Sequence, residues 1–512
     1  GDPIDVRGLD ELAGVTVGAD SLIRVVIRED EDDVRLLGGG GGQEATGQTE
    51  EKCQDAHRGE VQIIQTSRLN SATCYWFETL LGAACLHSMR LFTAFGLILA
   101  ASLAASPDPT PYPTKPSAKG IQVQMIPDAL ELGVHHAGLN LTLHGLLSPA
   151  QEAGPGQLTV SAGGFTFVLN EKYVQSMDRQ IRPLSDRGLV VTLILITYRS
   201  PHERIRALTV HPQADPVKGT TMAANTVTAE GRACYQALTE FIARRWSSAD
   251  TAHGRVWGWV ISNEVNSHHE WHQMGPVTVE QLATQYEDQV RLAWTSLRRH
   301  SAHARVYLSM EHHWNSQGHP DPLQACRGRS LLETFARRAK ERGDFDWHLA
   351  FHPYPSNLRD PRTWLDKVTF DDDSKKVTFK NLEVVARKLA SPEFRFDGKP
   401  RRLSLTEQGF DVTKRPDALA EQAAAYAYAW EKVARLDGAV DAFLYHRHVD
   451  HAMEGGLRFG LWSNKPGTTF EPDQKRPIWH LVKAADTPAW KAAAEPYLKT
   501  CGLTSWDELN PK

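Results

Sequence analysis

Short apolar runs alternate with amphipathic stretches along residues 120–490 of the 512-residue chain. Several of the runs are apolar on both faces, as in VVTLILI, which is typical of strands in a buried parallel sheet. The eight runs lie at residues 121–125, 134–143, 189–197, 256–261, 305–310, 347–351, 403–406 and 442–445. We expect each run to form a strand.

The stretches between the runs have the spacing and the end signals of helices. Thr278 and Gln281 have the spacing of a capping box, and apolar residues follow at helical spacing as far as Leu297. The Ala-rich stretch 418–436 ends at an Asp-Gly pair, which is a typical helix stop. Eight β/α alternations predict an α/β fold, a closed (β/α)8 TIM barrel with insertions. The alternative is an open doubly wound sheet, but no G-x-G-x-x-G fingerprint follows the first run.

The first hundred residues have a different pattern. All seven methionines fall at or after Met89, and residues 1–88 lack sustained periodicity and contain an acidic run and five consecutive glycines. We interpret 1–88 as a disordered or wrongly assigned upstream extension, with a true start at Met89; a real extension with an internal anchor helix is the alternative. Residues 89–106 have the layout of a secretory signal peptide, so we expect a secreted or periplasmic protein.

We expect the exported chain to consist of a Pro-rich linker at 107–119 and one catalytic domain at 120–512. Three cysteines remain in it, so at most one pair can form a disulfide. Hydrophobic residues make up 41% of the chain, ample for a large core. The net charge of −5 supplies no basic excess for binding nucleic acid.

Functional groups of such barrels lie at the carboxyl ends of the strands. The fourth run ends in Asn263-Glu264 and the seventh in Glu407. Two carboxylates that meet in one cleft can cleave a glycosidic bond, because one protonates the leaving oxygen while the other attacks the anomeric carbon or activates water. Their mutual repulsion helps to keep one of them protonated near neutral pH.

Polar and aromatic residues also follow the ends of the other runs. We take these as candidate substrate-binding residues: Asn140, His144, Asn263, His313, Trp314, His352, Tyr354, Tyr445, His446, His448 and Trp462.

The motifs ISNEVN, FHPYP and LTEQGF resemble those of the clan A glycoside hydrolases, which are retaining (β/α)8 enzymes. The resemblance implies that Glu264 is the general acid/base and Glu407 the nucleophile. It also implies that Asn263 holds the sugar hydroxyl beside the anomeric centre and that Tyr354 contacts the nucleophile. The chain is most similar to an uncharacterised bacterial domain family within this superfamily, over residues 120–509.

One position departs from the pattern of the superfamily. Many of its members carry an arginine at the end of the second strand, where this chain has Asn140 and His144. Substrate positioning is therefore expected to differ at this side of the cleft.

The sequence thus predicts an exported retaining glycosidase that acts on an oligo- or polysaccharide. We expect no cofactor, no metal, no nucleic-acid partner and no stable membrane span after signal cleavage. Two alternatives stay open: a barrel that binds carbohydrate or a cell-surface partner without turnover, and a metal-dependent hydrolase. The second is suggested by the many histidines, although the first run carries no H-x-H metal motif.

Overall fold

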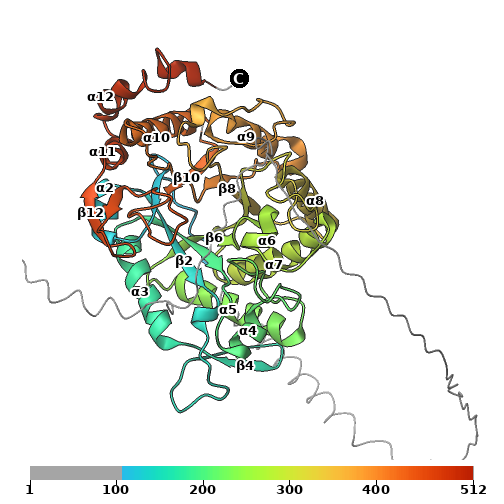
Figure 1. The fold of residues 1–512 in the computed structure, drawn as a ribbon. Helices are drawn as coiled ribbons and strands as arrows, with labels where there is room; N and C mark the ends of the chain where they lie inside the picture. Colours follow the sequence, from blue (N-terminus) through green and yellow to red (C-terminus); the bar gives the residue numbers. More distant parts are fainter. Residues whose placement is uncertain (1–105, 437, 511–512) are drawn as a thin grey trace, which may run out of the picture. The chain divides into compact units, whose positions relative to one another are not determined.

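A computed structural model describes residues 106–436 and 438–510. Eight parallel strands close a barrel in the order β1-β10-β9-β8-β7-β6-β5-β2 (Figure 1). The strands are β1 (Lys119–Gln122), β2 (His136–Thr142), β5 (Val190–Ile196), β6 (Val256–Ile261), β7 (Arg305–Glu311), β8 (Trp347–His352), β9 (Leu403–Leu405) and β10 (Val440–Tyr445). The first strand pairs with the last, so the predicted closed barrel is confirmed and the open sheet is wrong.

Helices follow the strands and surround the barrel (Figure 1). They are α2 (Ile126–Leu132), α3 (Glu171–Asp186), α4 (Glu203–Thr209), α5 (Ala229–Trp246), α6 (His268–Trp271), α7 (Val279–His300), α8 (Gly328–Glu341), α9 (Glu383–Ala390), α10 (Ala418–Ala434), α11 (Pro477–Ala484) and α12 (Trp490–Ala494). The predicted capping box is present: Thr278 and Gln281 each bond the other's backbone N–H at the start of α7.

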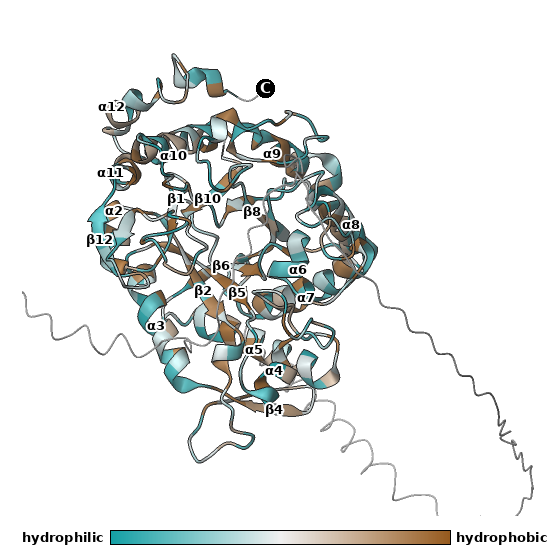
Figure 2. Cartoon of the chain, in the orientation of Figure 1, coloured by the Kyte–Doolittle hydropathy of each residue, from teal (hydrophilic) through white to brown (hydrophobic). Residues whose placement is uncertain are grey.

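Apolar side chains form two separate cores because successive strand residues point to opposite faces. The larger core lies between the strands and the helices, and it includes most apolar residues of both. The smaller one is contributed by four neighbouring strands and fills the barrel itself; it consists of Ile194, Ile196, Val260, Tyr307 and Ala350. In Figure 2 the strands are accordingly brown, whereas the outer helices carry much teal.

The Pro-rich segment predicted as a linker packs against the N-terminal end of the barrel. The backbone N–H of Asp108 donates to the carbonyl of His300 at 3.0 Å, and the Asp108 carboxylate pairs with Arg255. The ring of Tyr112 lies edge-on to Trp257, with centroids 6.0 Å apart. This segment is therefore part of the domain rather than a free linker.

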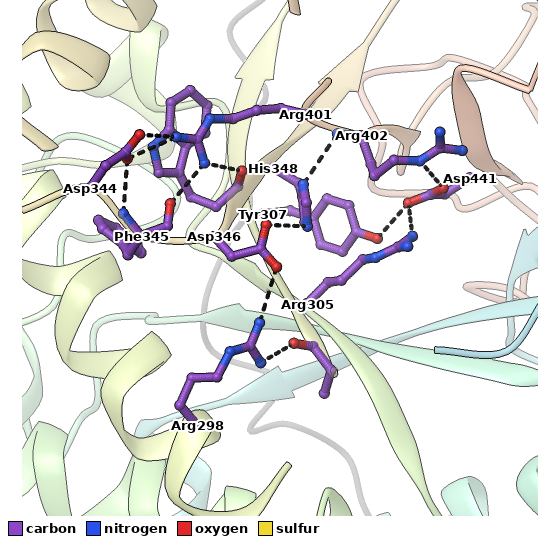
Figure 3. A network of polar contacts seen from close by, with 12 residues as sticks. Arg298, Arg305, Tyr307, Asp344, Phe345, Asp346, His348, Arg401, Arg402 and Asp441 are labelled. Carbon is purple, nitrogen blue, oxygen red and sulfur yellow. Dashed lines mark hydrogen bonds and ion pairs between the residues drawn. The ribbon is translucent and has the colours of Figure 1, made fainter. Parts of the chain in front are cut away.

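Charged residues at the starts of the later strands close the same end of the barrel. Asp441 accepts hydrogen bonds from Arg402 at 2.7 Å and from Tyr307 at 3.0 Å, and it also pairs with Arg305 (Figure 3). Beside them, the Arg401 guanidinium binds both carboxylate oxygens of Asp344. This network links β7, β8, β9 and β10 at the N-terminal end of the barrel.

Two small hairpins are added to the barrel, β3 (Thr159–Ala162) with β4 (Phe165–Val168) and β11 (Trp462–Asn464) with β12 (Pro472–Lys475).

The three cysteines of the described part are buried and free. None of its helices is long and apolar enough to cross a membrane. The predicted extension 1–88 and residues 89–105 of the predicted signal peptide lie outside the described residues.

Candidate active site

Glu264 lies in a turn with an unusual backbone directly after β6. Ser262 and Glu264 adopt left-handed conformations, with φ angles of 69° and 38°, which residues other than glycine rarely adopt. The backbone N–H of Glu264 donates to the hydroxyl of Ser309 on β7 at 2.9 Å. Strained backbone of this kind is often found at functional sites, where the surrounding structure holds it in place.

A buried chain of hydrogen bonds connects the Glu264 carboxyl to two neighbouring strands. His352, at the end of β8, places its Nδ1 at 2.8 Å from Oε1 of Glu264. Its Nε2 lies 3.1 Å from the hydroxyl of Thr406, just past β9. The imidazole is therefore held at both nitrogens and fixes the position of the carboxyl.

Glu407 follows Thr406 and faces the same space. Its Oε1 accepts a hydrogen bond from the Tyr354 hydroxyl at 3.1 Å, and among the described residues its other oxygen has no hydrogen-bond partner. A carboxylate oxygen of Glu407 lies within 4.8 Å of one of Glu264 and of a ring nitrogen of His352. Two carboxyl groups from different strands thus converge at the carboxyl end of the barrel.

The environment favours a proton on Glu264. Burial raises the pKa of Glu264 to about 7, and the charges of Glu407 and Glu311 act in the same direction against the opposing hydrogen bond from His352. Burial lowers the pKa of His352, but its hydrogen bond to Glu264 and the nearby carboxylates outweigh burial and raise it above the ordinary value. Burial and the charge of Glu407 raise the pKa of Tyr354, which stays protonated and donates.

Three predicted substrate-binding residues lie at the carboxyl ends of β2 and β6. No described residue hydrogen-bonds the side chain of Asn263 or of Asn140, and Asn140 is exposed on β2. His144 begins the short helix η2 (His144–Leu146), with its ring centroid 6.0 Å from that of Tyr198. Burial lowers the pKa of His144 to about 4, so its ring is neutral.

For three other residues the prediction of substrate binding is wrong. Trp314, Tyr445 and His448 are each 0% exposed and cannot touch a sugar. The rings of Trp314 and Tyr445 belong to the core between strands and helices, and the Tyr445 hydroxyl donates to the carbonyl of Phe459 at 2.8 Å. His448 Nδ1 accepts the backbone N–H of Gln124 at 3.0 Å.

The last candidates make defined contacts of their own. His446 is bound at both nitrogens, by Gln122 at 2.8 Å and by Glu454 at 3.0 Å. Trp462 donates its indole N–H to Asp128 on α2 at 3.2 Å. His313 binds Oε2 of Glu311 through its Nδ1 at 2.8 Å.

Sequence reasoning missed two residues of this site. Tyr198 follows β5, its ring packs on the core inside the barrel, and the charge of Glu407 together with burial raises the pKa of Tyr198 to about 12. Glu311 ends β7 directly beside His352 on β8. Both positions continue the inward-facing alternation of their strands, and that alternation was the signal for finding them.

The fold and the geometry define a (β/α)8 barrel protein with a pair of carboxyl groups at the end of the barrel where enzymes of this fold carry out catalysis. The chain belongs to a family of unknown function, DUF5722, whose model matches residues 111–509. The expected membership in an uncharacterised domain family is thus confirmed.

No curated protein sequence matches the chain. Among solved structures, it is similar to a family 39 glycoside hydrolase from Bacteroides cellulosilyticus WH2, with 14% identity and a TM-score of 0.43 over 70% of this chain and 59% of the other. A hyperthermophilic beta-glucosidase from Pyrococcus furiosus matches with 15% identity and a TM-score of 0.46, over 73% and 86%. A monomeric beta-xylosidase from Caulobacter crescentus CB15 matches with 17% identity and a TM-score of 0.40, over 69% and 62%.

Proposed function

We propose that this protein is a retaining glycoside hydrolase, with Glu264 as general acid/base and Glu407 as nucleophile. One observation carries the proposal: the carboxyl groups of Glu264 and Glu407 approach within 4.8 Å at the catalytic end of a (β/α)8 barrel, where burial raises the pKa of Glu264 to about 7. Retaining glycosidases hold their two carboxyl groups about 5–5.5 Å apart, whereas inverting enzymes need about 6.5–9.5 Å to admit a water.

In the first step the carboxylate of Glu407 attacks the anomeric carbon of the bound sugar. The bond to the leaving oxygen breaks, and Glu264 donates its proton to that oxygen. The hydrogen bond from Tyr354 orients the attacking carboxylate and leaves its other oxygen free to form the new bond.

In the second step Glu264, now ionised, accepts a proton from a water that attacks the anomeric carbon from the opposite side. The bond to Glu407 breaks and the sugar leaves with its original configuration. His352 stabilises the ionised form of Glu264 during this exchange, because its Nδ1 lies 2.8 Å from the carboxyl. The same pair of residues can thus hold the proton in one step and release it in the other.

The open polar groups around the pair suit a substrate rich in hydroxyls. The amides of Asn263 and Asn140 can each donate and accept hydrogen bonds, as a sugar hydroxyl does. Neither amide is hydrogen-bonded by a described residue, so both are available to a ligand. We therefore assign carbohydrate as the substrate class.

The test is hydrolysis of a panel of aryl glycosides of both anomeric configurations, including glucosides and xylosides. Wild-type protein should release the aryl group from at least one member. Glu407→Ala should not, and added azide should restore release by forming a glycosyl azide of inverted configuration. Binding without turnover across the panel would instead support a non-catalytic carbohydrate-binding barrel.

A second function is favoured by one specific observation. The donor atoms of Glu264, His352 and Glu407 all lie within 4.8 Å of one another. This spacing also allows the three residues to bind a divalent cation, which could activate a water for hydrolysis. The glycosidase proposal expects full activity after dialysis against a chelator. Loss of activity on chelation and its return with added zinc would favour the metal-dependent hydrolase.

We further propose that the protein is exported, on the basis of the signal-peptide pattern at 89–106. The mature chain should begin near residues 105–107. N-terminal sequencing of protein from the culture medium or periplasm tests this, and an intact Gly1 terminus would contradict it.

A further inference from the structure

We propose that Glu311 is a positioning residue: a buried anion that fixes the segment carrying Glu264 and whose charge helps to keep the acid/base proton in place. The inference rests on the proposed function, because it gives Glu311 a role toward Glu264. Glu311 ends β7, its carboxylate is almost fully buried, and its Cα neighbour on β8 is His352.

One oxygen of Glu311 holds the segment that follows Glu264. Oε1 accepts hydrogen bonds from the side-chain amide of Asn266 at 2.5 Å and from the hydroxyl of Ser267 at 2.9 Å. Both residues belong to the short helix η3 (Val265–Ser267), which begins directly after Glu264. The backbone N–H of Glu311 donates in turn to the side-chain oxygen of Asn266 at 2.9 Å, which closes a reciprocal pair.

The other oxygen holds the segment after β7. Oε2 accepts the backbone N–H of His313 at 2.9 Å and binds the Nδ1 of the same residue at 2.8 Å. Donors thus surround both oxygens, and only a carboxylate offers two acceptor oxygens with no donor of its own. A glutamine would turn its NH2 group against one pair of donors, so the position specifically requires an anion.

The same cluster has the spacing of a metal site, since donor atoms of Glu311, His312 and His313 lie within 4.8 Å of one another. Both oxygens of Glu311 are already engaged by hydrogen-bond donors, however. We therefore interpret the cluster as a hydrogen-bonded support for the neighbouring turn.

The charge of Glu311 acts on Glu264 as well. Burial would raise the pKa of Glu311, but the charge and hydrogen bonds of His313 outweigh burial and hold that pKa well below its usual range. Glu311 is therefore ionised throughout the pH range in which Glu264 titrates, and its negative charge is among the causes that raise the pKa of Glu264.

Three variants separate the charge from the hydrogen bonds. Glu311→Gln removes the charge together with one acceptor oxygen, Glu311→Asp keeps the charge, and Ser267→Ala removes one hydrogen bond without changing charge. In Glu311→Gln, the basic limb of the pH profile of kcat/KM should move to lower pH by roughly half a unit, the effect of one partly screened like charge. We expect kcat to fall about tenfold more on substrates with poor leaving groups than on those with good ones, with KM nearly unchanged.

The other two variants serve as controls for this shift. In Ser267→Ala and Glu311→Asp the basic limb should stay close to its wild-type position. The role of the charge would be overturned if the basic limb of Glu311→Gln stayed at its wild-type pH. It would also be overturned if Ser267→Ala moved the limb by as much as Glu311→Gln. Zinc-dependent thermal stabilisation that His312→Ala abolishes would overturn the proposal by making Glu311 a metal ligand.

A measurement on the resting protein separates this proposal from the proposed function. Carbon-13 NMR of labelled glutamate carboxyls can follow the titration of Glu264, assigned by its disappearance in Glu264→Gln. The titration midpoint should fall in Glu311→Gln even if no glycoside is turned over. An unchanged midpoint would overturn the inference while leaving the glycosidase proposal intact.

Discussion

The two ends of the barrel hold their carboxylates in opposite ways. At the N-terminal end, Asp441 is paired with Arg305 and Arg402 and also accepts a hydrogen bond from Tyr307 (Figure 3). Its negative charge is thus shared between two guanidinium groups that pack against the start of the barrel. This arrangement stabilises the fold and leaves no free oxygen for chemistry.

At the C-terminal end, Glu264 and Glu407 have few partners among the described residues, and neither is paired with an arginine. Glu407 accepts one hydrogen bond, from Tyr354, and Glu264 is bound by the imidazole of His352. Burial raises the pKa of Glu264 to about 7, although the hydrogen bond and the charge of His352 act in the opposite direction. Within this barrel, a carboxylate paired with arginines stabilises the fold, whereas the two carboxyl groups without an arginine partner are left available for chemistry.

The strongest test of this contrast is the substitution Glu407→Gln. It should lower turnover by on the order of 10⁴-fold or more, because the covalent step needs a carboxylate nucleophile. The thermal midpoint should not fall, since in the part of the chain that the structure describes this side chain has a single hydrogen bond. The matched control is Glu341→Gln on the last turn of α8, where an exposed carboxylate pairs with Arg337 alone among the described residues and activity should be unchanged.

The next effect concerns the pH dependence of the reaction. Glu264 must carry a proton to act as an acid, so kcat/KM should fall as the pH rises through about 7. In Glu264→Gln this limb should disappear, and substrates with poor leaving groups should lose about 10²- to 10⁴-fold in rate, with much smaller losses for good ones. If kcat/KM of Glu264→Gln still fell as the pH rose through about 7, the titrating proton would belong to another group.

At the opposite end, Asp441→Asn should affect stability and spare catalysis. Removing the charge leaves Arg305 and Arg402 without their shared partner, and we expect a loss of roughly 2–3 kcal/mol, less than for fully buried pairs because both arginines are partly exposed. Urea unfolding measures the loss, and kcat/KM should stay within about twofold of wild type at a temperature where both proteins are folded. A large change in kcat at that temperature would mean that the ion pairs of Asp441 at the N-terminal end affect catalysis at the C-terminal end.

The last effect is a gain of stability when Glu264, at the C-terminal end, loses its titration. Because the folded pKa of about 7 for Glu264 exceeds the ordinary 4.5, the folded protein binds the proton more tightly and loses stability as the pH rises through that window. Glu264→Gln removes this titration, so the variant should be more stable than wild type by roughly 3 kcal/mol at pH 8 and show little difference below pH 4. Equal stabilities at pH 8 would show that ionisation of the buried Glu264 carboxyl costs the folded protein no free energy of unfolding.

The barrel could be predicted because its strands are buried on both faces. Runs such as that of β5 are apolar throughout, and the spacing of the eight runs leaves room for one helix after each. The limits of the runs were less certain. The first run was predicted to extend to Met125, but β1 ends at Gln122 and Met125 precedes α2.

The site was predicted less completely, because a sequence indicates where a strand ends better than it indicates which way the next side chain points. His313 and His446 face polar partners, whereas their neighbours Trp314 and Tyr445 face the core around the barrel. Beyond a strand the strict alternation is lost, and side-chain direction depends on the course of the loop. His448 was assigned wrongly for that reason.

The most direct test of the central claim is the anomeric configuration of the first product, followed by proton NMR on a substrate that the wild-type protein cleaves. The approach of the Glu264 and Glu407 carboxyls to within 4.8 Å predicts that the first-formed sugar keeps the configuration of the substrate. Inverted product at the earliest time points would contradict the covalent role of Glu407 and with it the proposed mechanism.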